Sequence, residues 1–196
     1  MVNPMVKTSP LQNMASPAYG ITLAEAPFVG KVNVRGNAAD PAFTAAFASV
    51  LGVQPPLQPN TVARHGAYTA FWLGPDEWLI HTPQDGQENL IGALHVALGD
   101  QHCAVTDVSD YFVVIRMRGE KADQILARAC PLDLHPRAFP AGGCAQTIFA
   151  HASILLHHVE DGYDVQVRWT YAQYLWNYVA EAAGNTLRPV PAEAVG

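Results

Sequence analysis

VNVRGNAAD, residues 32–40, has a second version further along the chain in IRMRGEKAD, residues 115–123. The two stretches align without a gap at a constant offset of 83 positions. Four aligned pairs are identical: Arg35 and Arg118, Gly36 and Gly119, Ala39 and Ala122, Asp40 and Asp123. Apolar residues alternate with polar ones before each glycine, which is the period of a half-buried strand. Each stretch therefore predicts a strand that ends at a glycine.

The same order of elements continues beyond both glycines. Apolar residues then recur at helical spacing, at 41–51 in the first copy and 122–129 in the second. Proline-rich connections follow, QPPLQPN and CPLDLHPRAFPAGG. Each copy then has a predicted hairpin and a last helix: AYTAFWLGPDEWLIHT and residues 86–98, and ASILLHHVEDGYDVQVRW and residues 171–183. The sequence thus indicates two diverged copies of one unit, with chance similarity over nine residues as the alternative.

Hairpin turns this short cannot hold crossover connections, so the predicted strands are antiparallel, with helices on one face of each sheet. The fold class is therefore α+β. We expect one compact domain over residues 21–184, made of pseudo-repeats at about 21–102 and 103–184. Residues 1–20 are expected to form a mobile N-terminal arm, because prolines interrupt their apolar residues, and residues 185–196 a C-terminal tail.

Composition narrows the functional class. The 196-residue chain is 49% hydrophobic and carries a net charge of −6 with only 14% charged residues, so it lacks the basic surface that nucleic acids require. No window is apolar for long enough to span a bilayer, and the N-terminal segment has no signal-peptide core. We expect a soluble, cytoplasmic protein that binds neither nucleic acid nor membrane.

The segment from Cys130 to Cys144 raises the question of a metal site. Together with His135 it offers at most three ligands, without the paired close spacing of structural zinc sites, and a fourth such as His151 would have to come from the next strand. An extended connection with unligated thiols is the better interpretation. Without an export signal, these cysteines and Cys103 are expected to be reduced.

Catalytic candidates are weak. Asp107 and Asp110 could supply acid/base chemistry, but such residues beside a strand more often form turn hydrogen bonds. His157 and His158 are adjacent in a predicted strand, so they point to opposite faces and cannot share a ligand. A glycine-rich nucleotide loop is missing from the sequence. We therefore assign no catalytic residue and no metal ligand.

Several longer segments carry a family resemblance. TDVSDYFVVIRMRGEKADQILARACPLDLHPRAFPAGGCAQT, the later YLWNYV and the earlier LGPDEWLI resemble the gamma subunit of heterotetrameric sarcosine oxidase. The resemblance runs from about Gly30 to Ala183. That family is similar to the folate-binding part of glycine-cleavage aminomethyltransferases, which implies that the two copies are interlocked.

The resemblance also implies a function. Sarcosine oxidases of this type demethylate sarcosine to glycine, pass electrons through FAD and FMN to oxygen with production of hydrogen peroxide, and transfer the one-carbon unit to tetrahydrofolate. Flavin, NAD and folate sites are implied in the alpha and beta subunits, and none in gamma. The acidic pair that aminomethyltransferases carry in a Gly-Gly hairpin has no counterpart in HGAYTAFWLGPDEW or HASILLHHVEDGYD.

The main hypothesis is a non-catalytic structural subunit whose partners are the alpha, beta and delta subunits, with alpha in direct contact. One alternative is a free-standing protein that binds folate or performs folate-dependent one-carbon transfer. Another is an independent domain that has lost its ligand site. Aromatic residues cluster at the hairpins and the last helix, and such residues are enriched among binding hot spots. The predicted partner contacts are Trp176, on the side of the helix expected to be exposed, with Tyr171, Tyr174 and Tyr178.

Overall fold

The computed structural model describes residues 7–17 and 20–187. Residues 1–6 and 18–19 of the expected arm, and 188–196 of the expected tail, lie outside the described residues. The described chain forms two five-stranded antiparallel sheets. Sheet 1 has the order β6 (Ala104–Asp107), β2 (Gly30–Arg35), β5 (Glu77–Thr82), β4 (Tyr68–Gly74) and β3 (Val62–His65). Sheet 2 has the order β1 (Thr22–Ala26), β7 (Phe112–Arg118), β10 (Gly162–Arg168), β9 (Ala152–Val159) and β8 (Cys144–Phe149).

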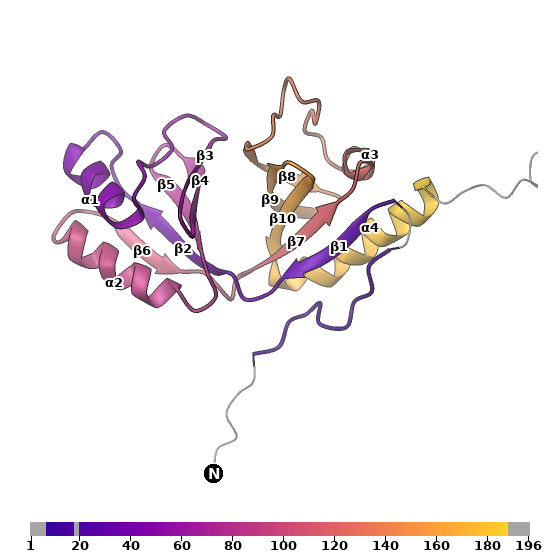
Figure 1. The fold of residues 1–196 in the computed structure, drawn as a ribbon, viewed down its shortest axis with the longest axis horizontal. Helices are drawn as coiled ribbons and strands as arrows, with labels where there is room; N and C mark the ends of the chain where they lie inside the picture. The colour runs from indigo at the N-terminus through magenta and orange to yellow at the C-terminus, as the bar shows by residue number, and fades with distance from the viewer. Residues whose placement is uncertain (1–6, 18–19, 188–196) are drawn as a thin grey trace, which may run out of the picture.

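Helices cover the outer face of each sheet, which gives four layers (Figure 1). The helices are α1 (Pro41–Leu51) and α2 (Gln87–Leu98) on sheet 1, and α3 (Ala122–Leu126) and α4 (Ala172–Leu187) on sheet 2, with a 3-10 turn at Trp169–Tyr171 before α4. The α+β class with antiparallel sheets is confirmed.

The two halves are interlocked through their first strands. β1 lies at the start of the first copy but pairs with β7 of the second, with Leu23 opposite Met117. In the same way β6 pairs with β2, with Val105 opposite Val34. Each sheet is therefore completed by a strand from the other half of the chain.

The repeated glycines occupy equivalent turns. The Gly36 amide donates to the Asp76 carbonyl at 3.0 Å, and the Gly119 amide donates to the Asp161 carbonyl at 3.2 Å. Asp76 and Asp161 both lie in the hairpin turn of their own copy, β4–β5 or β9–β10. The duplication thus extends to the hydrogen bonding that follows each repeated strand.

The helices after these glycines differ in length. α1 has strong local signals, because the Asp40 carboxylate accepts a hydrogen bond from the Ala42 amide at 2.8 Å and the helix ends at Gly52, whose φ is 73°. The second helix was predicted over residues 122–129, but α3 ends at Leu126 and continues as turns. It lacks a side-chain N-cap, so fewer local interactions hold it.

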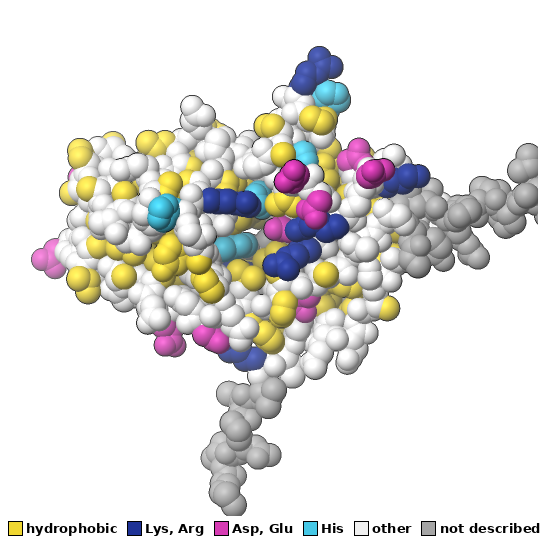
Figure 2. Space-filling model, viewed as in Figure 1, with side chains coloured by type: hydrophobic (Ala, Val, Ile, Leu, Met, Phe, Trp, Pro, Cys, Tyr) yellow, Lys and Arg dark blue, Asp and Glu magenta, His cyan; other side chains and the backbone are white. Residues whose placement is uncertain are grey.

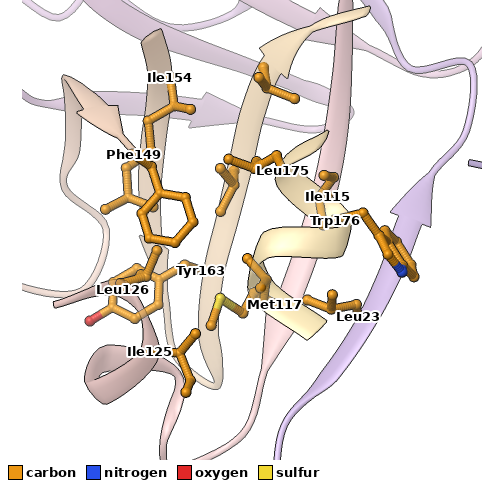
Figure 3. Close-up of a cluster of buried hydrophobic side chains, with 14 of the residues drawn as sticks. Leu23, Ile115, Met117, Ile125, Leu126, Phe149, Ile154, Tyr163, Leu175 and Trp176 are labelled. Atoms are coloured by element: carbon orange, nitrogen blue, oxygen red, sulfur yellow. The ribbon is translucent and has the colours of Figure 1, made fainter. Parts of the chain in front are cut away.

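The larger hydrophobic core lies between sheet 2 and its helices. Met117, Ile125, Phe149 and Leu175 fill it, and Figure 3 shows their side chains pointing toward one another. Residues 7–17 of the expected arm pack on its edge, where Leu11 is only 4% exposed. The mobility expected of the arm stays a prediction, although its described part contacts the sheet and α4.

Candidate functional site

The inner faces of the two sheets meet along a surface that we call the seam. Its centre is a small apolar cluster of Phe71, Leu79, Cys144 and Leu155, all at most 7% exposed. Strand alternation explains the composition, because every second residue of β4, β5 and β9 faces the other sheet. The outward neighbours in the same strands belong to the two helix-covered cores.

A polar network crosses the seam beside this cluster. Arg64 on sheet 1 donates to Nε2 of His157 on sheet 2 at 2.9 Å, which leaves the His157 proton on Nδ1. That nitrogen lies 3.8 Å from the Asp164 carboxylate, and Arg118 donates to the same carboxylate at 2.5 Å. Figure 2 shows charged and histidine side chains gathered over the seam.

A second polar contact joins the sheets directly. His81 Nε2 donates to the Gln166 side-chain carbonyl at 2.6 Å. Burial, partly offset by this hydrogen bond, lowers the pKa of His81 to about 4, so the ring is neutral near pH 7. Phe71 contacts the edges of both seam histidines, with ring centroids 4.7 Å from His81 and 5.2 Å from His157.

The charged members of the network stabilise one another. Burial alone would raise the pKa of Asp164, but the neighbouring His157 and Arg118 outweigh it and lower that pKa to about 2. Arg118 also donates to the Tyr163 carbonyl at 2.6 Å and pairs with Asp161 at 2.9 Å. Most of the donors of its guanidinium therefore have partners.

The side chains of the seam are better suited to holding the two sheets together than to catalysing a reaction. Burial raises the pKa of the Cys144 thiol to about 11, which keeps it protonated and poorly nucleophilic. One nitrogen of each seam histidine is occupied, by Arg64 or by Gln166. Groups arranged in this way bind the two sheets to each other.

Sequence reasoning did not predict the seam contacts, because Arg64 and His81 stand alone in the sequence and the partner of His157 lies 93 positions away. It also missed Lys31, which is only 2% exposed and whose ammonium donates to the Val29 carbonyl at 2.7 Å and the Ser109 carbonyl at 3.2 Å. Burial lowers the pKa of Lys31 to about 8. The available signal was the polar face of KVNVR, residues 31–35, which an exposed strand would also show.

The structure corrects the placement of Trp176. The sequence placed this side chain on the exposed side of the last helix, but it is 3% exposed and belongs to the core. Its indole donates to the Ala15 carbonyl at 3.1 Å and lies beside β1 in Figure 3. Helical periodicity could not reveal this, because the covering segment comes from the other end of the chain.

The tyrosines of α4 and its preceding turn remain accessible. Tyr171 is 40% exposed and Tyr174 is 37% exposed, with ring centroids 6.3 Å apart. Tyr178 is half-buried, and its ring lies against Phe149 at 5.4 Å. Tyr171 and Tyr174 therefore present more of their rings to a partner than Tyr178 does.

The remaining candidates are dispersed. Among the described residues, no three His, Cys, Asp or Glu side chains are grouped as metal ligands. Cys130 lies 3.8 Å from the Thr147 hydroxyl, whereas Cys144 lies in the seam. The segment between these two cysteines has turns and neither a helix nor a strand, so its interpretation as a connection is confirmed, although it is not extended throughout.

Asp107 has the role of a turn residue. Its carboxylate accepts hydrogen bonds from the Ser109 amide at 2.8 Å and from the Ser109 hydroxyl at 2.5 Å. Asp110 lies at the surface, where it lines a cleft with Tyr111. Within the described part of the chain, no helix is long and apolar enough to cross a membrane.

Comparison with known proteins gives a consistent result. Residues 35–185 match the model of the sarcosine oxidase gamma subunit family. A relative, sarcosine oxidase subunit gamma from Corynebacterium sp. (strain P-1), is 32% identical over 185 residues, covering 90% of each chain.

Two solved structures are also similar. A chain of heterotetrameric sarcosine oxidase from Corynebacterium sp. U-96, in complex with pyrrole 2-carboxylate, matches with a TM-score of 0.86 at 26% identity, covering 95% of this chain and 99% of that one. Aminomethyltransferase T of the glycine cleavage system from Bartonella henselae shares the fold, with a TM-score of 0.64 at 13% identity, covering 88% of this chain and 51% of that one. This chain belongs to the sarcosine oxidase gamma subunit family.

Proposed function

We propose that this chain is a non-catalytic structural subunit of a heterotetrameric sarcosine oxidase. The observation that carries the proposal is the match to a chain of the heterotetrameric enzyme over nearly the full length of both chains. The seam supports it, since its centre is filled by side chains and its polar groups are bonded to one another. In the assembled enzyme the reaction is the demethylation of sarcosine to glycine, with hydrogen peroxide formed and the one-carbon unit passed to tetrahydrofolate.

The proposal assigns FAD, FMN, NAD and tetrahydrofolate to the partner subunits. The seam side chains do not fit such groups, because a ligand between the sheets would have to displace the contact of Phe71 with His81 and His157. The proposed partners are the alpha, beta and delta subunits in the cytoplasm, with alpha in direct contact at the exposed tyrosines Tyr171 and Tyr174.

Co-expression with the other three subunits tests this function. We expect the four chains to elute together and to produce peroxide from sarcosine, while the isolated chain shows no flavin absorbance and no such activity. A yellow isolated chain would contradict the structural role. An active complex that forms without retaining this chain would contradict its membership of the assembly.

Titration of the isolated chain with tetrahydrofolate distinguishes the folate-binding alternative from the structural role. The pocket to consider is one of about 560 Å³ at the edge of the seam, lined by Asn33, Gln146 and Gln166 among others. The side chains of all three are hydrogen-bonded within the protein, to Glu77, to the Leu73 carbonyl and to His81. We expect no saturable binding, and a saturable signal that Gln166→Ala abolishes would favour the alternative.

A further inference from the structure

A surface cleft of about 620 Å³ lies where the two halves of the chain cross. Three connections build it: Phe28 comes from the link between β1 and β2, Tyr111 from the link between β6 and β7, and Trp169 from the turn that follows β10. Arg168, the last residue of β10, completes it. We call these four residues the aromatic cleft. Figure 1 shows the first two links running between the sheets.

The aromatic cleft is held in one shape by its own contacts. The Trp169 amide donates to the Tyr111 carbonyl at 3.0 Å, and the Arg168 guanidinium lies 5.3 Å from the centre of the Tyr111 ring. Phe28 has a φ of 54°, a left-handed conformation that is unfavourable for a residue with a bulky side chain. Such backbone strain persists only where the surrounding structure enforces it, and it is found preferentially at binding sites.

Exposed aromatic side chains concentrate around this cleft. Among the described residues, Tyr111 is 47% exposed and Trp169 is 37% exposed, and the exposed Tyr171 and Tyr174 follow Trp169 in the same turn and in α4. The other large exposed apolar side chains lie singly on separate elements: Leu57, Val96 and Ile148. Aromatic and arginine side chains are the types that dominate binding energy at protein interfaces.

The charge at the cleft indicates what the occupant carries. Arg168 is exposed and stacks on Tyr111, and no carboxylate of the described residues lies within ion-pair distance of it. Two other charged side chains line the cleft, Lys7 and Asp110. Lys7 is already paired with Asp85 at 3.2 Å, and the charges of Asp85 and, more weakly, Asp110 raise the pKa of Lys7. An occupant that pairs with Arg168 therefore bears a carboxylate next to the apolar group that enters the cleft.

We propose that the aromatic cleft receives an apolar side chain of another subunit of the oxidase, flanked by an Asp or Glu that pairs with Arg168. This inference rests on the proposed function, which supplies a partner protein of a different sequence. The partner chain would cover Trp169 and Tyr111, and the Arg168 pair would gain strength as water is excluded from it.

The test measures binding of this chain to the complex of the other three subunits. Trp169→Ala removes the largest wall of the cleft, and Arg168→Glu reverses the charge offered to the carboxylate. Ile148→Ala and Arg137→Glu are matched controls, since both residues are exposed and lie on other segments. We expect each cleft variant to weaken binding at least tenfold, and each control to stay within about twofold of the wild type.

The outcomes separate the two proposals. A wild-type chain that does not bind the other subunits refutes the proposed function, whereas a wild type that binds and cleft variants that bind equally well refute the cleft alone. Circular dichroism and thermal unfolding check that each variant is folded. If Trp169→Ala does not fold, the result for Arg168→Glu, which is a surface change, decides the test. Self-association of the wild type that Trp169→Ala abolishes, with subunit binding unchanged, would assign the cleft to a second copy of this chain and overturn the proposal.

Discussion

The two sheets present equivalent positions to the seam with opposite chemistry. In sheet 1 the positions hold Phe71 and Leu79, which lie opposite each other in the strand register. In sheet 2 they hold His157 and Asp164, which are opposite each other in the same way. At these positions, one copy thus contributes apolar side chains and the other contributes polar side chains that need hydrogen-bond partners.

The equivalence follows from the strand register. Leu79 pairs with Asn33, and Asp164 pairs with Arg116, and those two partners are separated by the repeat offset of 83 positions. Equivalent residues also touch across the seam, since Phe71 contacts His157. A duplicated surface that meets itself can diverge in this way, provided that each buried polar group keeps a hydrogen-bond partner.

The largest expected difference between the copies is at the repeated glycines. A Cβ at Gly119 would lie 2.6 Å from the Gly20 carbonyl oxygen, and its φ of 122° is strained for other residues. A Cβ at Gly36 would instead lie 2.2 Å from the ring of Phe43, which is a side chain and not backbone. Gly119→Ala should lower the free energy of unfolding by about 3 kcal/mol, and Gly36→Ala by about 1–2 kcal/mol.

Urea denaturation of the full chain measures both losses. Gly92→Ala, in α2 with open space around its Cβ, is the matched control and should be neutral or slightly stabilising. A larger loss at Gly36 than at Gly119 would show that the Phe43 ring is less adaptable than the backbone at Gly20.

The repeated arginines should differ next. Arg118 pairs with Asp161 and Asp164 and its side chain is 23% exposed, whereas Arg35 pairs with Glu77 and is 57% exposed. Solvent screens the exposed pair more strongly. Arg118→Ala should lower the free energy of unfolding by about 2 kcal/mol, because it removes the donor that lies 2.5 Å from the Asp164 carboxylate, and Arg35→Ala should lower it by less.

Thermal unfolding at low and high salt checks this difference. The loss at Arg35 should shrink in 1 M NaCl, because the salt already screens the wild-type pair, while most of the loss at Arg118 should persist. Equal losses that both vanish in salt would mean that the seam network is as hydrated as the surface.

The sequence predicted most of the local structure in both copies. Alternation, turn residues and helical spacing identified β2, α1 and the two hairpins, because these features depend on neighbours in the chain. The exchange of β1 and β6 between the sheets was not readable from residues, since either strand could pair with its own copy. Family resemblance supplied the interlocking.

The contacts across the seam and the burial of Trp176 under the N-terminal arm could not be predicted, because both depend on partners that are distant in the sequence. Arg64 meets His157 from 93 positions away, and Ala15 meets Trp176 from 161 positions away. Single polar residues in strands carry no signal of such distant partners. The helix period identified α4 as amphipathic, but it could not tell which side the arm would cover.

The contact of His81 with Gln166 gives a pH-dependent prediction. These residues are equivalent in the two copies, since their register partners Lys31 and Val114 are separated by the repeat offset. The folded-state pKa of His81, about 4, is below its ordinary value near 6.5, so the unfolded chain binds the proton more readily. Stability from this residue is present above about pH 6.5 and decreases as the pH falls toward about 4.

Unfolding midpoints between pH 7 and pH 4.5 measure this dependence. His81→Gln keeps a donor toward Gln166 but cannot titrate. Between pH 7 and pH 4.5 the free energy of unfolding should therefore fall by about 1–2 kcal/mol less in the variant than in the wild type, a figure already reduced for the partial exposure of His81. Identical pH profiles for the wild type and the variant would mean that His81 is protonated without disturbing the seam.

The smallest effect is expected at the repeated aspartates, which occupy equivalent positions in the two copies but have different structural roles. Asp40 caps α1 by accepting from the Ala42 amide at 2.8 Å, whereas Asp123 lies inside α3 and accepts from the adjacent Gln124 amide at 2.8 Å. Losing an N-cap costs about 1 kcal/mol, so Asp40→Ala should exceed Asp123→Ala, for which about 0.5 kcal/mol is expected from the helix dipole. Asp40→Asn, which retains a capping oxygen, should recover most of the loss. Equal losses at the two aspartates would show that α3, despite its shortness, depends on local signals as much as α1 does.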